Sequence, residues 1–192
     1  MVNSTVKIIQ ALLYIASHQK DKCVDFMKAY KLLWLADRCH LRMHGRTITN
    51  DKYYAMPYGI VPTDAKHLLE GEATNLTTPE DYLERRIKIV SKHKYEAVAE
   101  PDLKEFSKSD IDVLNKVLEN YNGLKPMELS LLSHKYPEWK QYEKMLNNEN
   151  EKNSFPVNMD LFFENSDEDE ADIFDQSSEM LEMTKEIYHE YN

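Results

Sequence analysis

The chain has 192 residues, of which 42% are hydrophobic, and a formal net charge of −10. This length suits one domain with its own core and leaves little room for two full domains. No stretch approaches the roughly 18 to 20 consecutive apolar residues of a membrane helix, and the first twenty residues lack the pattern of a secretion signal, so we expect no membrane contact and a cytoplasmic location.

The two cysteines, Cys23 and Cys39, are too few for a disulfide scaffold and form no CxxC pair. We expect both to be buried thiols that pack as small apolar groups. A reducing cytoplasm suits them.

The negative charge is concentrated in residues 148–192, called here the C-terminal segment. It contains 14 acidic residues and two lysines, a net charge of −12, whereas residues 1–147 contain 20 acidic and 22 basic residues, a net charge of +2. Neither region has the basic excess that phosphate contacts need, which argues against direct nucleic-acid binding. A basic protein partner suits the C-terminal segment better.

The N-terminal part of the sequence predicts two helices. In residues 4–19 apolar residues recur at spacings of three and four, as on one face of a helix. A longer helix is expected between Asp25, which can cap its first turn, and Gly45, which can close its end. Four consecutive apolar residues at 32–35 predict that this second helix is buried on more than one side.

The next part predicts extended segments and short helices. Residues 46–63 indicate short extended segments around Asn50 and Asp51 and then an irregular loop. Thr63 can cap a short helix that ends at Gly71. Residues 86–101 predict a β-hairpin that turns near 91–93.

Three helices are then expected before residue 147. The first is capped by Ser109, with Asp112 three residues later, and ends near Gly123; the others begin at Pro126 and Pro137. The whole predicts a mostly α, α+β fold: a compact helical domain over residues 1–147 with a small β-hairpin.

The C-terminal segment begins with a polar linker. Seven of the twelve residues from 164 to 175 are acidic and none is basic. Self-repulsion at this charge density opposes compaction, so we expect an extension that is disordered until it binds, with a possible helix over 177–192. Two alternatives are a solubilising tail and a segment that folds back on its own body.

Three residues of the second helix have the spacing of metal ligands. Asp37, His40 and His44 could share one helical face, but Leu41 stands where an HExxH motif requires glutamate. A half-exposed polar face, with local ion pairs of Asp37 and Arg38, is the favoured interpretation. We therefore expect neither a metal nor another cofactor.

No catalytic motif is complete. Each of the four glycines has a turn or helix-end position, so no phosphate-binding loop is present. Ser130, Ser133 and His134 are close in sequence, but a hydrolase triad also needs an acid from elsewhere in the fold. A helix end followed by a helix that docks Trp139 in the core is favoured.

Two groups of residues are candidates for partner binding. The segment YYAMPYG places large side chains around a bend, as in protein-binding hot spots, although at least half of them should be buried. In the C-terminal segment, aromatic and apolar residues among the carboxylates could anchor a basic partner. The candidates are Tyr54, Met56 and Tyr58, together with Phe162, Phe163, Asp167, Glu168, Asp169, Ile173 and Phe174.

Residues 30–63, YKLLWLADRCHLRMHGRTITNDKYYAMPYGIVPT, resemble the signature of the Panacea domain family, the SocA-like antitoxins or phage-associated GepA-like proteins. Residues 107–121, and Ser133, His134 and Trp139, resemble its second half. The resemblance covers roughly residues 5–145 and not the C-terminal segment. The chain departs from the pattern at Ile60, where proline is usual, and at Trp34, where tyrosine is commoner.

The resemblance implies a helical domain with a small β component that acts as a bacterial or phage antitoxin. We expect a non-enzymatic protein that neutralises a cognate toxin by direct binding; the toxin's identity does not transfer. The first alternative is an adaptor that delivers its target to a ClpXP-type protease, as one member does. The second is a metal-dependent hydrolase that uses Asp37, His40 and His44.

Overall fold

The computed structural model describes residues 4–72, 81–148, 152–166 and 172–191. It is mostly helical with two small antiparallel sheets, which confirms the α+β class that the sequence predicts. The elements in chain order are α1 (Ser4–Ser17), β1 (Cys23–Asp25), α2 (Phe26–His44), β2 (Tyr53–Met56), β3 (Gly59–Pro62), α3 (Thr63–Glu70), β4 (Ile87–Ser91), β5 (Lys94–Ala97), η1 (Leu103–Glu105), α4 (Lys108–Tyr121), α5 (Pro126–Ser133), α6 (Pro137–Lys140), α7 (Glu143–Leu146), β6 (Phe155–Pro156), η2 (Met159–Phe163), η3 (Asp172–Phe174) and α8 (Ser178–Tyr191).

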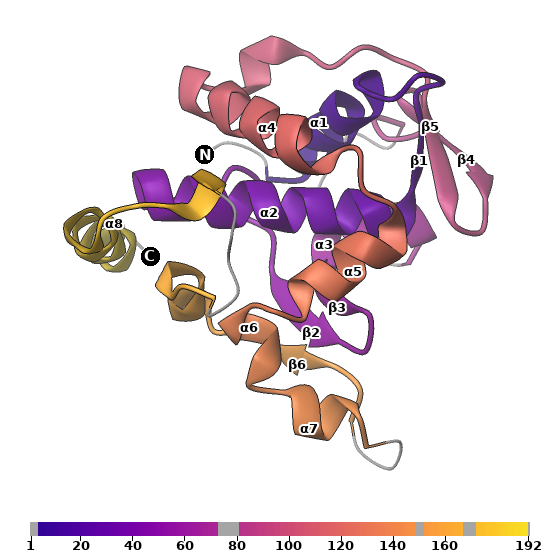
Figure 1. Ribbon diagram of the computed structural model, residues 1–192. Helices are drawn as coiled ribbons and strands as arrows, with labels where there is room; N and C mark the ends of the chain where they lie inside the picture. Colours follow the sequence, from indigo (N-terminus) through magenta and orange to yellow (C-terminus); the bar gives the residue numbers. More distant parts are fainter. Residues whose placement is uncertain (1–3, 73–80, 149–151, 167–171, 192) are drawn as a thin grey trace.

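Helix α2 runs through the middle of the molecule, with α1 and α4 on one side and α5 on the other (Figure 1). Its predicted ends are confirmed. The Asp25 carboxylate accepts hydrogen bonds from the amides of Met27 and Lys28 at 2.9 and 3.4 Å. Gly45 closes the helix at φ 67°, a left-handed conformation that glycine adopts without strain.

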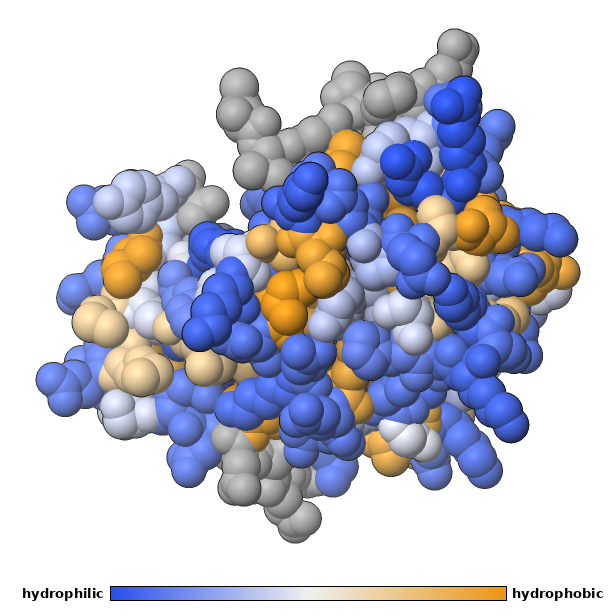
Figure 2. All heavy atoms as spheres, turned by 90° about the horizontal axis from the view of Figure 1, so that it is seen from above, coloured by the Kyte–Doolittle hydropathy of each residue, from blue (hydrophilic) through white to orange (hydrophobic). Residues whose placement is uncertain are grey.

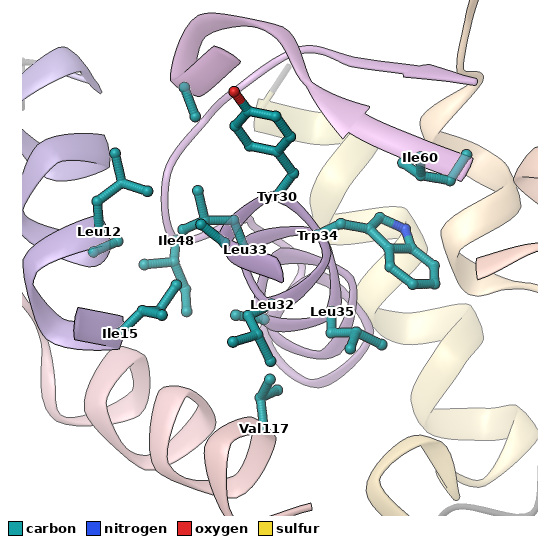
Figure 3. Packing of buried hydrophobic residues seen from close by; sticks show 14 of the residues in the cluster. Leu12, Ile15, Tyr30, Leu32, Leu33, Trp34, Leu35, Ile48, Ile60 and Val117 are labelled. Atoms are coloured by element: carbon teal, nitrogen blue, oxygen red, sulfur yellow. The ribbon is translucent and has the colours of Figure 1, made fainter. Parts of the chain in front are cut away.

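The four consecutive apolar residues of α2 point to different neighbours, and each is at most 1% exposed. Figure 3 shows Leu32 directed toward Val117 of α4, Leu33 beside Ile48, and Trp34 on the side of α2 where Ile60 of β3 lies. The Trp34 indole nitrogen donates to Glu138 of α6 at 3.0 Å. The predicted burial of α2 on several sides is therefore confirmed, and α2 is the element on which the other layers are assembled.

One three-stranded sheet has the order β1-β5-β4. The β4–β5 pair, with Ser91 opposite Lys94, is the predicted hairpin. The second sheet has the order β3-β2-β6. Its β2–β3 hairpin pairs Tyr53 with Pro62 and Met56 with Gly59, so the expected irregular loop is wrong. The sequence did not predict β3 as a strand because all four of its residues are buried, so apolar and polar residues do not alternate along it.

Two predicted helix caps, Ser109 and Thr63, are wrong. Helix α4 is capped by Ser107 and not by Ser109. The Ser107 hydroxyl accepts from the amide of Asp110 at 3.2 Å, and the Asp110 carboxylate accepts from the Ser107 amide at 2.9 Å. This reciprocal pair satisfies two free amides at once. The predicted single helix after Pro137 is divided into α6 and α7.

At α3 the cap position is Pro62, so Thr63 is the first helical residue. The free amides of the first turn are satisfied from another loop, because the Asp51 carboxylate accepts from the amides of Asp64 and Ala65, both at 2.9 Å. Helix α3 is thereby tied to the loop that precedes β2.

The C-terminal segment packs against the rest of the chain wherever it is described. Strand β6 pairs with β2, and η2, η3 and α8 all contact α2. Helix α8 is the predicted terminal helix. For residues 152–166 and 172–191 the structure thus matches the alternative in which the segment folds back on its own body, and not an extension that waits for a partner.

Neither thiol is in a disulfide, and Cys39 is buried whereas Cys23 is half-buried in β1. Within the described ranges, no helix has both the length and the apolar character needed to cross a membrane.

Candidate partner-binding site

The aromatic segment of the sequence forms the β2–β3 hairpin. Tyr58 lies in its turn and is 61% exposed, whereas Tyr54 and Met56 are half-buried on β2. The indole nitrogen of Trp139 donates to the Met56 carbonyl at 2.9 Å, and the Ser130 hydroxyl donates to the Tyr58 carbonyl at 2.9 Å. Both bonds hold the main chain near the turn, so the exposed Tyr58 ring stands on a fixed support.

A cavity of about 880 Å³ opens beside β2, and Tyr54 lies on its wall. Other parts of the wall come from α1, the loop before β2, residues 104–107, residues 156, 157 and 159, and Tyr188 of α8. Basic and acidic side chains are mixed on it: Lys7, Arg46, Lys52 and Lys104 with Asp51 and Glu105.

Two of these cations already have a carboxylate partner in α4. Lys7 and Arg46 contact Asp110 at 2.7 and 2.9 Å. Burial raises the pKa of Asp110, but hydrogen bonds from His40, Lys7 and the Ser107 amide, with the charge of Lys7, outweigh it and hold this pKa well below its usual range. The cavity therefore has little excess charge, which suits polar and apolar contacts more than a multiply charged ligand.

The residues with metal-ligand spacing have separate structural partners. Asp37 is fully buried and accepts hydrogen bonds from the amides of Ile48 and Thr49, at 2.8 and 3.0 Å, and from the Tyr53 hydroxyl at 2.7 Å. It fixes the loop before β2 onto α2. The half-exposed polar face expected here is wrong, because both Asp37 and Arg38 are completely buried.

The ring of His40 lies 4.5 Å from that of His44, between centroids, but both of its ring nitrogens already have other partners. Nδ1 lies 2.8 Å from the Arg46 carbonyl, and Nε2 lies 3.1 Å from the Ser109 hydroxyl and 3.1 Å from Asp110. His44 is exposed. In the part of the chain that the structure describes, no group of three or more potential ligands could hold a metal ion.

The serine and histidine residues near residue 133 have structural contacts. The Ser133 hydroxyl donates to the Ser130 carbonyl at 2.7 Å. His134 stacks on Trp139 with ring centroids 3.8 Å apart, and burial lowers the pKa of His134. Trp139 is 4% exposed, which confirms that it docks in the core.

Arg42 of α2 attaches the C-terminal segment through its main chain. The buried guanidinium donates to the carbonyl oxygens of Phe162, Glu164 and Phe174 at 3.0, 3.1 and 2.9 Å. It also donates to the side chains of Asn165 and Gln176. One side chain thus satisfies acceptors on both sides of the 167–171 range.

Arg38, one turn earlier on α2, continues this attachment. It pairs with Glu138 of α6 at 3.0 Å, both side chains being fully buried, and donates to the Glu164 carbonyl. Its guanidinium lies over the rings of Tyr136 and Phe174, 4.5 and 4.8 Å from their centroids. The guanidinium group therefore joins α2, α6 and the C-terminal segment.

Lys31 belongs to a row of buried basic residues on α2 that was not predicted from the sequence. Its amine donates to the Ile60 carbonyl of β3 at 2.7 Å, and burial lowers its pKa to about 7. Lys31, Arg38 and Arg42 are spaced by seven and four residues and so lie along one face of the helix; we call them the basic row. Charged residues inside the apolar run of α2 were the available signal.

The predicted binding residues of the C-terminal segment are distributed differently from expectation. Asp167, Glu168 and Asp169 lie outside the described residues. The other four are core residues, at most 6% exposed: Phe162, Phe163, Ile173 and Phe174. In this conformation they contact the chain itself.

A family model described as antitoxin SocA-like, Panacea domain, matches residues 30–140. This is more than half of the chain, so the chain belongs to that family, as the resemblance of its sequence implied. The match runs from α2 through the β2–β3 hairpin to α6 and does not include the C-terminal segment. No curated protein and no solved structure matches the chain.

Proposed function

We propose that the chain is a non-enzymatic antitoxin that binds and neutralises a protein toxin directly. Its contact surface is centred on Tyr58, with Tyr54 and Met56 on the adjoining strand. The family supports an antitoxin-like role. We choose this surface because the Tyr58 ring is exposed on a hairpin turn. Hydrogen bonds from Trp139 and Ser130 hold the main chain of that turn.

An aromatic side chain on a rigid support is well suited to binding. Tyrosine has few rotatable bonds, so little conformational entropy is lost when a partner covers it, and the fixed main chain adds no ordering cost. An anchor of this kind typically accounts for roughly 2 kcal/mol of binding free energy or more. Tyr58 is 61% exposed and therefore has apolar area left to bury.

We assign a supporting part in binding to the C-terminal segment. Phe162, Phe163, Ile173 and Phe174 hold the segment on the body. Its carboxylates, Asp167, Glu168 and Asp169 included, then attract a basic surface of the toxin and speed its encounter. Binding takes place in the cytoplasm, where the two free thiols stay reduced.

The polar residues that an enzymatic function would require have structural partners instead. Asp37 holds the loop before β2, His40 holds the α2–α4 contact, and Ser133 donates to its own helix. These contacts favour a protein that works by presenting a surface. Blocking a partner requires complementary area and no reacting group.

The test is co-expression with a toxic protein encoded beside this gene. The wild-type chain should restore growth, and Tyr58→Ala should bind the purified toxin about 30-fold more weakly, the equivalent of roughly 2 kcal/mol. The free energy of unfolding of this variant should stay within about 0.5 kcal/mol of wild type because Tyr58 is exposed.

Val98→Ala is the matched control, since Val98 is an exposed residue, 51% accessible, outside the hairpin. It should neutralise like wild type. Equal binding by Tyr58→Ala and wild type would rule out this surface. A toxin whose half-life shortens in a protease-dependent way would instead place the chain among the proteolytic adaptors.

A further inference from the structure

Helix α8 has one face that is already occupied. The Thr184 hydroxyl is buried and donates to the Arg42 carbonyl at 3.0 Å, which fixes α8 to the end of α2. Lys185 and His189 approach Asp160 of η2 at 3.6 and 3.1 Å. This side of the helix, including its basic residues, faces the protein.

The adjacent face of α8 carries an apolar stripe. Met180, Met183, Ile187 and Tyr191 are spaced by three, four and four residues, and they are 40, 54, 36 and 77% exposed. Ile187 is the least exposed of them because its side chain also packs against Gly45 at the end of α2, whereas both methionines are open to solvent. In Figure 2 apolar side chains gather at the left edge of the molecule, where α8 lies in Figure 1. An apolar stripe with this period is typical of a helix that packs against another helix.

A row of glutamates borders the stripe. Glu179, Glu182, Glu186 and Glu190 each directly precede a stripe residue and are all exposed. Among the residues that the structure describes, none of these four carboxylates is in an ion pair. Because successive residues are turned by about 100° on a helix, the carboxylates form a continuous edge along one side of the stripe.

We propose that this face of α8 binds a basic amphipathic helix of the partner protein. The apolar side of that helix covers the methionines, and its lysines or arginines lie along the glutamate row. Methionine adapts its shape to such a surface because its side chain is unbranched and flexible. The identity of the occupant rests on the proposed function, since it takes the toxin as the partner.

A second copy of this chain fits the face poorly. Two α8 helices packed antiparallel would bring their glutamate rows together, and like charges oppose that approach. Each copy also has a net charge of −10. Charge complementarity therefore selects a cationic partner. The apolar stripe favours a partner helix that also has an apolar side, which a simple polycation lacks.

The probe is a fluorescein-labelled synthetic peptide of about 18 residues, five helical turns, with leucines at spacings of three and four and lysines along one flank. Fluorescence anisotropy with the full-length chain measures its binding. Met180→Gln with Met183→Gln keeps side-chain length and helix propensity and should weaken binding at least tenfold. Glu182→Gln with Glu186→Gln should weaken it about fivefold and reduce its salt dependence.

Matched controls are Met127→Gln on α5, where the side chain is 51% exposed, and Glu84→Gln with Glu119→Gln at exposed sites elsewhere. Both should bind the peptide within twofold of wild type. Circular dichroism checks that each variant melts at the wild-type temperature.

Three results would overturn the inference. One is equal binding of the peptide by wild type and the methionine variant. Another is equal binding of a scrambled peptide of the same composition, which would show attraction without an apolar contact. The third is a dimer, seen by sedimentation, that the methionine variant abolishes.

The neutralisation assay separates this inference from the proposed function. If wild type binds the peptide through α8 but never protects cells from the neighbouring protein, the surface stands and the antitoxin assignment fails. If wild type protects cells and the methionine variant protects them equally, with the peptide unbound by either, the surface fails alone.

Discussion

Residues 1–147 and the C-terminal segment differ in charge and in the way they are held. The first region has a net charge of +2 and surrounds α2 with helices and hairpins; the second has a net charge of −12 and wraps one face of α2. Opposite charges suggest contacts between carboxylates and lysines. The described contacts that anchor the segment are of another kind: guanidinium groups donate to main-chain carbonyls, and aromatic rings fill the core.

This difference shows how an acidic segment can be attached without using its carboxylates, the groups that the proposed function assigns to a partner. A carbonyl acceptor is present at every residue, so Arg42 holds the segment without using its acidic side chains. The buried rings supply apolar stabilisation that is independent of charge. Under the proposed function, the main chain and the buried rings of this stretch attach it, and its carboxylates are left for recognition.

Removal of the C-terminal segment after Lys152 should have the largest effect. Four apolar side chains would leave the core, at roughly 3 kcal/mol or more each for the aromatic ones, and Arg38 and Arg42 would lose buried acceptors. This sum is comparable to the whole stability of a typical domain, so residues 1–152 should not melt cooperatively. Thermal unfolding followed by circular dichroism measures this.

A chain that ends after Gln176 is the control, because it keeps every described acceptor of Arg38 and Arg42 and loses only α8. It should melt cooperatively at a moderately lower temperature. A fragment 1–152 as stable as the full chain would show that the segment is detachable, as its charge alone suggests.

Arg42→Met should cost about 3 kcal/mol of unfolding free energy. Methionine fills similar space but leaves the carbonyls of Phe162 and Phe174 buried without this donor. Urea unfolding gives the free energy, and limited proteolysis should show faster cleavage beyond residue 152. Arg85→Met is the control, since Arg85 forms an exposed pair with Asp81 and should change stability by less than about 0.5 kcal/mol. Similar losses in both variants would exclude a special role for Arg42.

Lys31, the residue of the basic row that contacts the β2–β3 hairpin, predicts that the free energy of unfolding depends on pH. Burial lowers the pKa of Lys31 to about 7, whereas the amine has its ordinary pKa of 10.5 in the unfolded chain. Between these values the unfolded chain binds one more proton, so the free energy of unfolding should rise with pH, by at most about 1.4 kcal/mol per pH unit. The guanidinium groups of Arg38 and Arg42 keep their protons throughout this range.

Urea unfolding of wild type and Lys31→Met at pH 7, 8 and 9 isolates this contribution. The variant has no amine to titrate, so its stability should rise less steeply than that of wild type. Parallel curves for the two proteins would mean that Lys31 stays charged in the folded state and that the rise, if any, has another source.

Local signals in the sequence predicted the ends of α2, its burial and the β4–β5 hairpin, because a cap, a terminal glycine and alternating residues act over a few positions. The β2–β3 hairpin was missed because its second strand has no exposed side. The basic row was missed because charged residues are usually exposed, and burial of Arg42 depends on acceptors about 120 positions further along the chain. Charge density predicted a disordered C-terminal segment, whereas the spaced aromatic residues of its described parts, 152–166 and 172–191, are packed in the core.

The smallest effect, and the sharpest test of how the segment is held, concerns salt. If attraction between carboxylates and lysines holds it, raising sodium chloride from 50 to 500 mM should release it, because the screening length falls from roughly 14 to 4 Å. Hydrogen bonds from buried guanidinium groups to carbonyls, and packing of Phe162 and Phe174, are shielded from solvent ions. The rate of proteolysis beyond residue 152 should therefore change by less than about twofold over this range, and the melting temperature by only a few degrees. Asp160→Asn removes the carboxylate that faces Lys185 and His189, an exposed contact, and should leave this salt independence intact. Cleavage that accelerates tenfold at 500 mM would instead show that charge attraction holds the segment, and the carboxylates would then not be free for a partner.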